Sequence, residues 1–292
     1  MSGLLTLDRI AGAPISWGLC EVPGWGYQLT PERVLSEMRD LGLGATEFGP
    51  PGFLAVDPHE RVAQLSRYDM SSVGGFYVAL LHDPNHDPLP GIDTFIDECL
   101  AANAGTVVVA AGTGQDGYDA RPTLDDAGWA TLLGNLDRIH DHAIARGVQA
   151  TLHPHMGTMI ENGEETQRVL DGSRASLCID TGHLAAAGAD PVAIAKANPA
   201  RIKHVHLKDV DLGMAASVAS GDIAFGDAVR AGMFRPLGAG DVDIAGLVSA
   251  LESAGYSGWY VLEQDLMLAA EPDGDGPVAD VRACIDYLTK EN

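Results

Sequence analysis

The chain has 292 residues, of which 41 are acidic and 18 are basic, so its formal net charge is −23. This length accommodates one large α/β barrel or two ordinary domains. The acidity argues against a nucleic acid or an anionic membrane surface as partner. No stretch approaches the roughly 18 consecutive apolar residues of a membrane helix. The first segment, MSGLLTLDRIAG, lacks signal-peptide features, and the four cysteines are widely spaced. We therefore expect a cytoplasmic protein with reduced thiols that acts on a small molecule.

Short β-prone apolar runs alternate with amphipathic segments along the whole chain. The expected strands cover residues 10–16, 45–48, 73–81, 106–110, 148–152, 176–179, 202–207 and 259–262. The expected helices cover residues 31–41, 59–69, 92–104, 124–146, 164–170, 191–197 and 244–254. Thr30 and Asp190 each precede a proline, which is a helix-start signal.

This alternation predicts the fold class. Eight β/α repeats over this length favour an α/β protein of the (β/α)8 TIM barrel type, as a single domain over residues 1–292. A doubly wound sheet is the structural alternative, but no phosphate-binding glycine motif opens a helix. Residues 211–241 form an insertion between the seventh and eighth strands. We expect a helix at 222–231 within it and a position over the barrel mouth.

Polar residues suited to metal binding or proton transfer follow each of the last four expected strands. They are His153 and His155, Asp180 and His183, His204, His206 and Lys208, and Glu263. Catalytic residues of TIM barrels lie at the C-terminal ends of the strands, which meet at one end of the barrel. The pattern therefore predicts a divalent-metal enzyme.

The segment HVHLKD carries the strongest of these signals. On a strand, His204, His206 and Lys208 share one face, which in a barrel is the lumen. Three polar side chains directed inward are costly to bury unless they bind something. His206 is a natural metal ligand, and a nearby cation would disfavour the ammonium form of Lys208 and make it a better base or acid. A pair of hydrogen-bonded core histidines is the alternative.

The other three segments each allow two interpretations. Asp180 ends a buried run, where it either binds a cation or caps the following segment. His183 is a second ligand or a hydrogen-bonding residue. His153 and His155 flank a proline that stiffens the pair. Glu263 is either the last member of the metal-binding cluster or the partner of a neighbouring basic residue.

Weaker candidates follow the other strands and the loop after HPHMGT. Those expected to line a substrate pocket are Trp17, Glu47, His82 and Glu161. The sequence contains no serine or cysteine nucleophile motif, so covalent catalysis is not expected.

At these residues the chain resembles the xylose isomerase-like TIM barrel superfamily of sugar isomerases and epimerases, and within it the inosose dehydratase branch. The resembling segments are APISWG, HPHMGT, CIDTGHLAAAGADP, RIKHVHLKDV, FRPLGAGDVD and VLEQD. The resemblance implies a barrel with one divalent cation, often Mn²⁺, Co²⁺ or Zn²⁺, and a sugar or cyclitol substrate. It also implies a homo-oligomer. The implied ligands are His153, Asp180, His206 and Glu263.

His153 departs from the pattern of the epimerases, which typically carry a glutamate there as one of two bases. With a histidine at this position, a reaction that uses one base and a separate acid fits better than epimerisation with two bases. This favours dehydration. We predict a metal-dependent lyase that dehydrates a cyclic keto-polyol such as 2-keto-myo-inositol through an enediolate. Glu263 or His155 would be the base, and His183 or Lys208 the acid. A metal-dependent sugar or keto-sugar isomerase or epimerase is the alternative, followed by an inactive metal- or sugar-binding barrel.

Overall fold

The computed structural model describes residues 3–115 and 121–290, and its parallel strands close into a barrel with the order β1-β10-β7-β6-β5-β4-β3-β2. The barrel strands are β1 (Ile10–Gly12), β2 (Ala45–Glu47), β3 (Ser71–Leu80), β4 (Thr106–Gly112), β5 (Gln149–Leu152), β6 (Ser176–Asp180), β7 (Ile202–Leu207) and β10 (Tyr260–Leu262). The predicted (β/α)8 barrel is confirmed.

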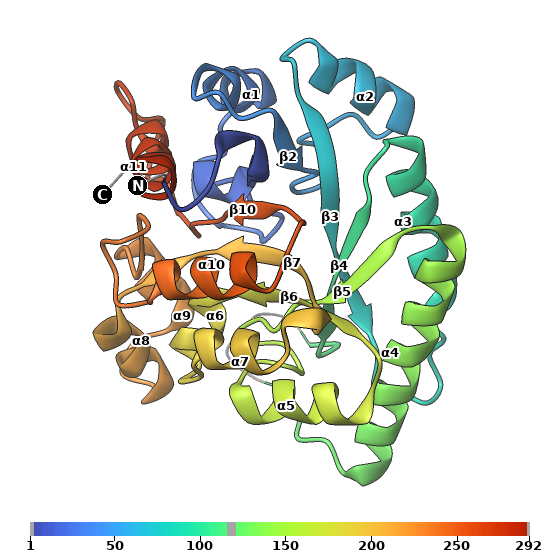
Figure 1. Cartoon of the computed structure of the whole chain (residues 1–292). Coiled ribbons are helices and arrows are strands. Elements are labelled where there is room, and N and C mark those ends of the chain that lie inside the picture. The colour runs from blue at the N-terminus through green and yellow to red at the C-terminus, as the bar shows by residue number, and fades with distance from the viewer. Residues whose placement is uncertain (1–2, 116–120, 291–292) are drawn as a thin grey trace.

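Helices surround this barrel (Figure 1). They are α1 (Pro31–Asp40), α2 (Pro58–Ser66), α3 (Leu89–Ala101), α4 (Asp126–Arg146), α5 (Gly163–Gly172), α6 (Thr181–Ala186), α7 (Pro191–Ala197), α10 (Ile244–Ser253) and α11 (Pro277–Thr289). The predicted caps Thr30 and Asp190 accept hydrogen bonds from the third residue of their helices. None of the helices in the described ranges is both long and apolar enough to span a bilayer.

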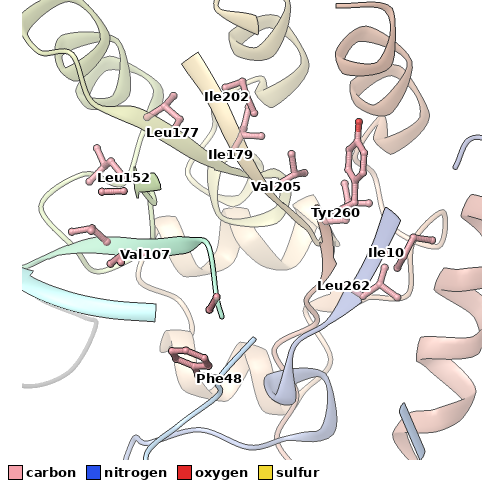
Figure 2. Close-up of a cluster of buried hydrophobic side chains, with 14 of the residues drawn as sticks. Ile10, Phe48, Val107, Leu152, Leu177, Ile179, Ile202, Val205, Tyr260 and Leu262 are labelled. Carbon is pink, nitrogen blue, oxygen red and sulfur yellow. The ribbon is translucent and has the colours of Figure 1, made fainter. Parts of the chain in front are cut away.

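Side chains that point outward from the barrel strands form the main core beneath the helices. Figure 2 shows Ile10, Val107, Leu177 and Val205 from four different strands in this layer. Their neighbours in sequence point the other way, into the lumen, as the two-residue period of a strand requires. The apolar layer therefore fixes which residues of each strand face the barrel interior.

The first strand is shorter than its apolar run. β1 ends at Gly12, and Pro14 opens a 3-10 helix (Pro14–Trp17) in place of the expected strand to residue 16. Proline lacks the N–H that a ladder needs, so the run turns at this point. The last helix, α11, lies beside the N-terminal segment (Figure 1), where Leu5 N donates to Leu288 O at 2.9 Å.

The segment between β7 and α10 forms a small substructure on the opposite side of the molecule from α4 (Figure 1). It contains β8 (Asp209–Val210), α8 (Leu212–Ala219), α9 (Phe225–Arg230) and β9 (Phe234–Arg235), with β8 and β9 antiparallel. The helix expected at 222–231 is α9. Phe225 and Phe234 belong to a separate buried cluster, which ties this segment to the barrel mouth.

A buried carboxylate anchors this segment to the end of β7. The side chain of Asp209 is fully buried and accepts backbone N–H bonds from Val210, Gly238, Gly240 and Val242 at 2.8–3.0 Å. No ion pair to Asp209 occurs among the described residues, so these four donors stabilise its charge. The FRPLGAGDVD motif is thus a backbone cradle around one aspartate.

Replacing Asp209 with alanine is expected to lower the free energy of unfolding by about 3 kcal/mol or more, because several buried N–H groups lose their acceptor. Urea unfolding followed by circular dichroism measures this loss. The matched control is Asp211→Ala, which removes a half-exposed cap of α8 and should cost about 1 kcal/mol. Equal losses for the two variants would contradict this role of Asp209.

Candidate active site and metal centre

Two irregularities in the sheet direct side chains into the lumen. The pairing of β2 with β3 shifts register between Thr46 and Glu47. The pairing of β6 with β7 shifts before Cys178 and then aligns Asp180 with His206. Such bulges change the direction of the following side chains. Glu47 at the end of β2, Asp180 at the end of β6 and His206 on β7 therefore converge inside the barrel.

The four residues expected to bind metal lie together. One ligand atom from each of His153, Asp180, His206 and Glu263 lies within 4.8 Å of the others. His153 Nε2 is 3.2 Å from Asp180 Oδ2, and His206 Nδ1 is 2.9 Å from Glu263 Oε2 and 3.8 Å from Asp180 Oδ2. The structure thus brings the four strand ends into one cluster.

The donor set and its unsatisfied atoms fit a divalent cation. His206 Nδ1 and Glu263 Oε2 face each other, yet both are buried without a well-aligned hydrogen bond. Two imidazoles and two carboxylates are ligands that suit zinc, manganese or cobalt. The two carboxylate oxygens of Asp180 have different partners. Oδ1 accepts a hydrogen bond from the N–H of His183 at 2.8 Å, and Oδ2 faces the cluster. It therefore caps α6 and contributes to the cluster at once.

Lys208 is surrounded by acceptors beside this cluster. Its Nζ lies 2.7 Å from Asp265 Oδ1, 2.8 Å from His183 Nε2 and 3.1 Å from Glu263 Oε2. Burial lowers the pKa of Lys208, but Asp180, Asp265 and Glu263 outweigh it and raise the pKa above the ordinary value. These carboxylates therefore retain the proton of Lys208, and the disfavoured ammonium expected beside a bound cation stays a prediction.

His183 and Asp265 flank Lys208. His183 is fully buried, and burial, with the charges of His155 and Lys208, lowers its pKa well below the ordinary value. The Nε2 of a neutral His183 therefore accepts a hydrogen bond from the Lys208 ammonium. Asp265, which we did not predict, has its pKa raised to about 6 by burial, although Lys208 opposes the shift. The sequence signal for Asp265 was its position two residues after Glu263, because residues two apart on an extended segment point to the same side.

His155 lies against these groups with a defined ring orientation. Its Nδ1 is 2.7 Å from the carbonyl oxygen of Met156, and its ring centroid is 3.8 Å from that of His183. Burial, with the charges of His153 and Lys208, lowers the pKa of His155 to about 3. The imidazole is therefore neutral near pH 7. An Nδ1–H donated to Met156 makes Nε2 the basic nitrogen.

Glu47 reaches the cluster from β2 and joins two imidazoles. Its Oε1 lies 2.8 Å from His204 Nε2 and 3.0 Å from His206 Nε2. Burial raises the pKa of Glu47, but His206 and His204 outweigh it and lower the pKa to about 2. Glu47 borders the cavity as expected, and its carboxylate is held by both histidines.

A cavity of about 340 Å³ opens over the cluster. Its polar wall includes Glu21, Glu47, His153, His155, Lys208, Glu263 and Asp265. Its aromatic wall consists of Trp25, Phe76, Tyr77, Phe95 and Phe225. The cavity has the size and mixed lining of a small-molecule site.

Three residues expected to line this pocket lie elsewhere. Trp17 packs in the main core, and its Nε1 donates to Glu37 of α1, while Trp25 contributes the indole at the cavity. His82 follows the end of β3 and is not among the cavity-lining residues. Glu161 accepts the N–H of Gly157 and borders a second cavity of about 920 Å³. None of these three residues lines the cavity above the cluster.

The barrel and the polar ends of its strands define an enzyme with its active site at the C-terminal face of a TIM barrel. The chain belongs to the xylose isomerase-like TIM barrel family, whose model matches residues 32–288. It is 32% identical over 268 residues to an inosose dehydratase of Geobacillus thermodenitrificans, covering 88% of this chain and 89% of the relative. It is 33% identical over 271 residues to the rhizopine catabolism protein MocC of Rhizobium meliloti, covering 88% of this chain and 81% of the relative.

Among solved structures, the zinc-bound IolI protein has the same fold. It aligns with a TM-score of 0.70 at 14% identity, over 96% of this chain and 98% of IolI. Together with the inosose dehydratase relatives, the family assignment makes this chain a sugar-processing enzyme of the dehydratase or isomerase type.

Proposed function

We propose that the enzyme removes water from a cyclic keto-polyol such as 2-keto-myo-inositol, with a divalent cation bound by His153, Asp180, His206 and Glu263. The observation that carries the proposal is the convergence of these four ligand atoms beside the ammonium of Lys208. The dehydratase relatives support the reaction, and the zinc atom in IolI supports a metal in a barrel of this fold.

The reaction needs a base for the proton on the carbon next to the carbonyl. When bound, the cation would polarise the carbonyl and an adjacent hydroxyl and so acidify this proton. His155 is neutral, faces the cavity and presents Nε2 as its basic nitrogen. Glu263 faces the same cavity, but it belongs to the four residues that we propose as ligands of the cation. We therefore assign His155 as the base.

The reaction also needs an acid for the departing hydroxyl. Lys208 borders the cavity and keeps its proton, whereas His183 accepts a hydrogen bond from it and does not line that cavity. We assign Lys208 as the acid, with His183 and Asp265 as the residues that position it. The base takes the α-proton, the β-hydroxyl leaves with the Lys208 proton as water, and the enol that remains takes up a proton on carbon to give the dione.

The charge of the cavity favours an uncharged substrate. The lining includes the carboxylates Glu21, Glu47, Glu263 and Asp265. Lys208 is the only lysine or arginine among the described lining residues, and it is already engaged by carboxylates. A phosphate ester or a carboxylic acid would meet like charge from these carboxylates, although the proposed cation would offset part of that charge. A neutral keto-polyol avoids this repulsion.

The direct test is an assay of the metal-stripped protein with 2-keto-myo-inositol and added Mn²⁺, Co²⁺ or Zn²⁺. We expect metal-dependent loss of water and appearance of dione absorbance. No product with any of these ions would overturn the dehydratase assignment. In D₂O, incorporation of deuterium without loss of water would instead identify an isomerase or epimerase.

A further inference from the structure

We propose that Glu47 is a positioning residue that fixes which ring nitrogen of His206 faces the metal centre. The inference rests on the proposed metal site. Glu47 would hold the Nε2–H of His206, which leaves Nδ1 unprotonated and directed at Asp180 and Glu263. His204 would share the same carboxylate and hold it in place.

The two sides of the His206 ring carry the argument. On one side, Nε2 is 3.0 Å from Glu47 Oε1. On the other, Nδ1 is 2.9 Å from Glu263 Oε2 and 3.8 Å from Asp180 Oδ2. A neutral imidazole carries one N–H, so a donor at Nε2 makes Nδ1 the lone-pair nitrogen. Histidine ligands generally donate their second nitrogen to a carboxylate or carbonyl in this way.

Glu47 makes this contact across the lumen. In the barrel, β2 and β7 are separated by β1 and β10. The register shift before Glu47 directs its side chain inward, and it is 4% exposed. No lysine or arginine pairs with it among the described residues, so His204 and His206 supply its hydrogen-bond donors. A buried carboxylate needs such donors.

A second cation held by Glu47, His204 and His206 is the competing explanation, because their ligand atoms also cluster. The hydrogen bonding disfavours it, because Glu47 already accepts from both histidines, whereas His206 Nδ1 and Glu263 Oε2 on the other side of the ring have no hydrogen-bond partner among the described residues. Glu47 Oε1 is 2.8 Å from His204 Nε2 and 3.0 Å from His206 Nε2, which are hydrogen-bond lengths. His206 would also have to bind an ion through each of its nitrogens.

The test is the affinity and stoichiometry of Mn²⁺ binding, measured by competition with a fluorescent chelator. We expect wild type to bind one ion per chain and Glu47→Gln to bind it about 10–100-fold more weakly. The matched control is Glu252→Gln, which removes a carboxylate bonded to Arg9 and Tyr260 outside the metal cluster. This control should bind Mn²⁺ as tightly as wild type.

The outcomes separate the two levels of the proposal. A wild-type protein that binds no ion would overturn the metal centre itself. Equal affinity of wild type and Glu47→Gln would overturn only the role of Glu47, as would two ions in wild type and one in the variant. If the variant does not fold, nitrogen NMR of zinc-loaded wild type decides. A proton on Nε2 of His206 supports the inference, and a proton on Nδ1 refutes it.

Discussion

Lys208→Met is expected to lower kcat for dehydration by about 10²–10⁴-fold, the usual contribution of a positioned general acid. The side chain borders the cavity, and its proton is the one that we assign to the departing hydroxyl. The substitution removes a positive charge near Asp180 and Glu263. Mn²⁺ affinity should therefore stay the same or increase. Steady-state kinetics at saturating Mn²⁺, together with a binding titration, measure both effects.

The chain offers a matched control for this variant on the same strand. Lys203 lies on β7 but is exposed on the outside, so Lys203→Met should leave kcat unchanged. If Lys208→Met bound Mn²⁺ normally and retained wild-type kcat, Lys208 would not be the acid. Loss of activity in both lysine variants would point to a general effect on the fold.

Asp180→Asn should weaken Mn²⁺ binding by more than about 100-fold, since changes outside the direct ligands already cost 10–100-fold. The carboxylate is completely buried and its Oδ2 faces both His153 and His206. Asparagine keeps an oxygen that can still cap α6 at His183 N. The variant therefore separates the metal role from the capping role. Activity should fall with the affinity and return in part at high Mn²⁺ concentration.

Asp190→Asn is the control for capping. Asp190 caps α7 through the N–H of Ala193 and does not belong to the four-residue cluster. Its substitution should change neither Mn²⁺ affinity nor kcat. Unchanged Mn²⁺ affinity in Asp180→Asn would mean that the strand-six carboxylate is only a cap.

Local rules were sufficient to predict the fold and the convergence of His153, Asp180, His206 and Glu263. The two-residue period of β7 places His204 and His206 in the lumen and Val205 in the outer core, as the sequence indicated. The polar residues at the C-terminal ends of β5, β6, β7 and β10 converge because parallel barrel strands end at one face. These relations depend on spacing within one strand and on topology, both of which are visible in a sequence.

Partners from distant strands were not predictable in the same way. Glu47 and His204 are 157 positions apart, and their hydrogen bond depends on a register shift that leaves no sequence signal. Trp17 was expected at the mouth, but the turn at Pro14 places it in the core, and Trp25 borders the cavity instead. The proton state of Lys208 depends on three carboxylates from different strands and loops.

The most direct test of the metal centre is the anomalous scattering of crystals soaked in Mn²⁺. We predict one peak per chain, bounded by His153, Asp180, His206 and Glu263 at the floor of the cavity. A peak between Glu47, His204 and His206, or the absence of any peak inside the barrel, would contradict this account.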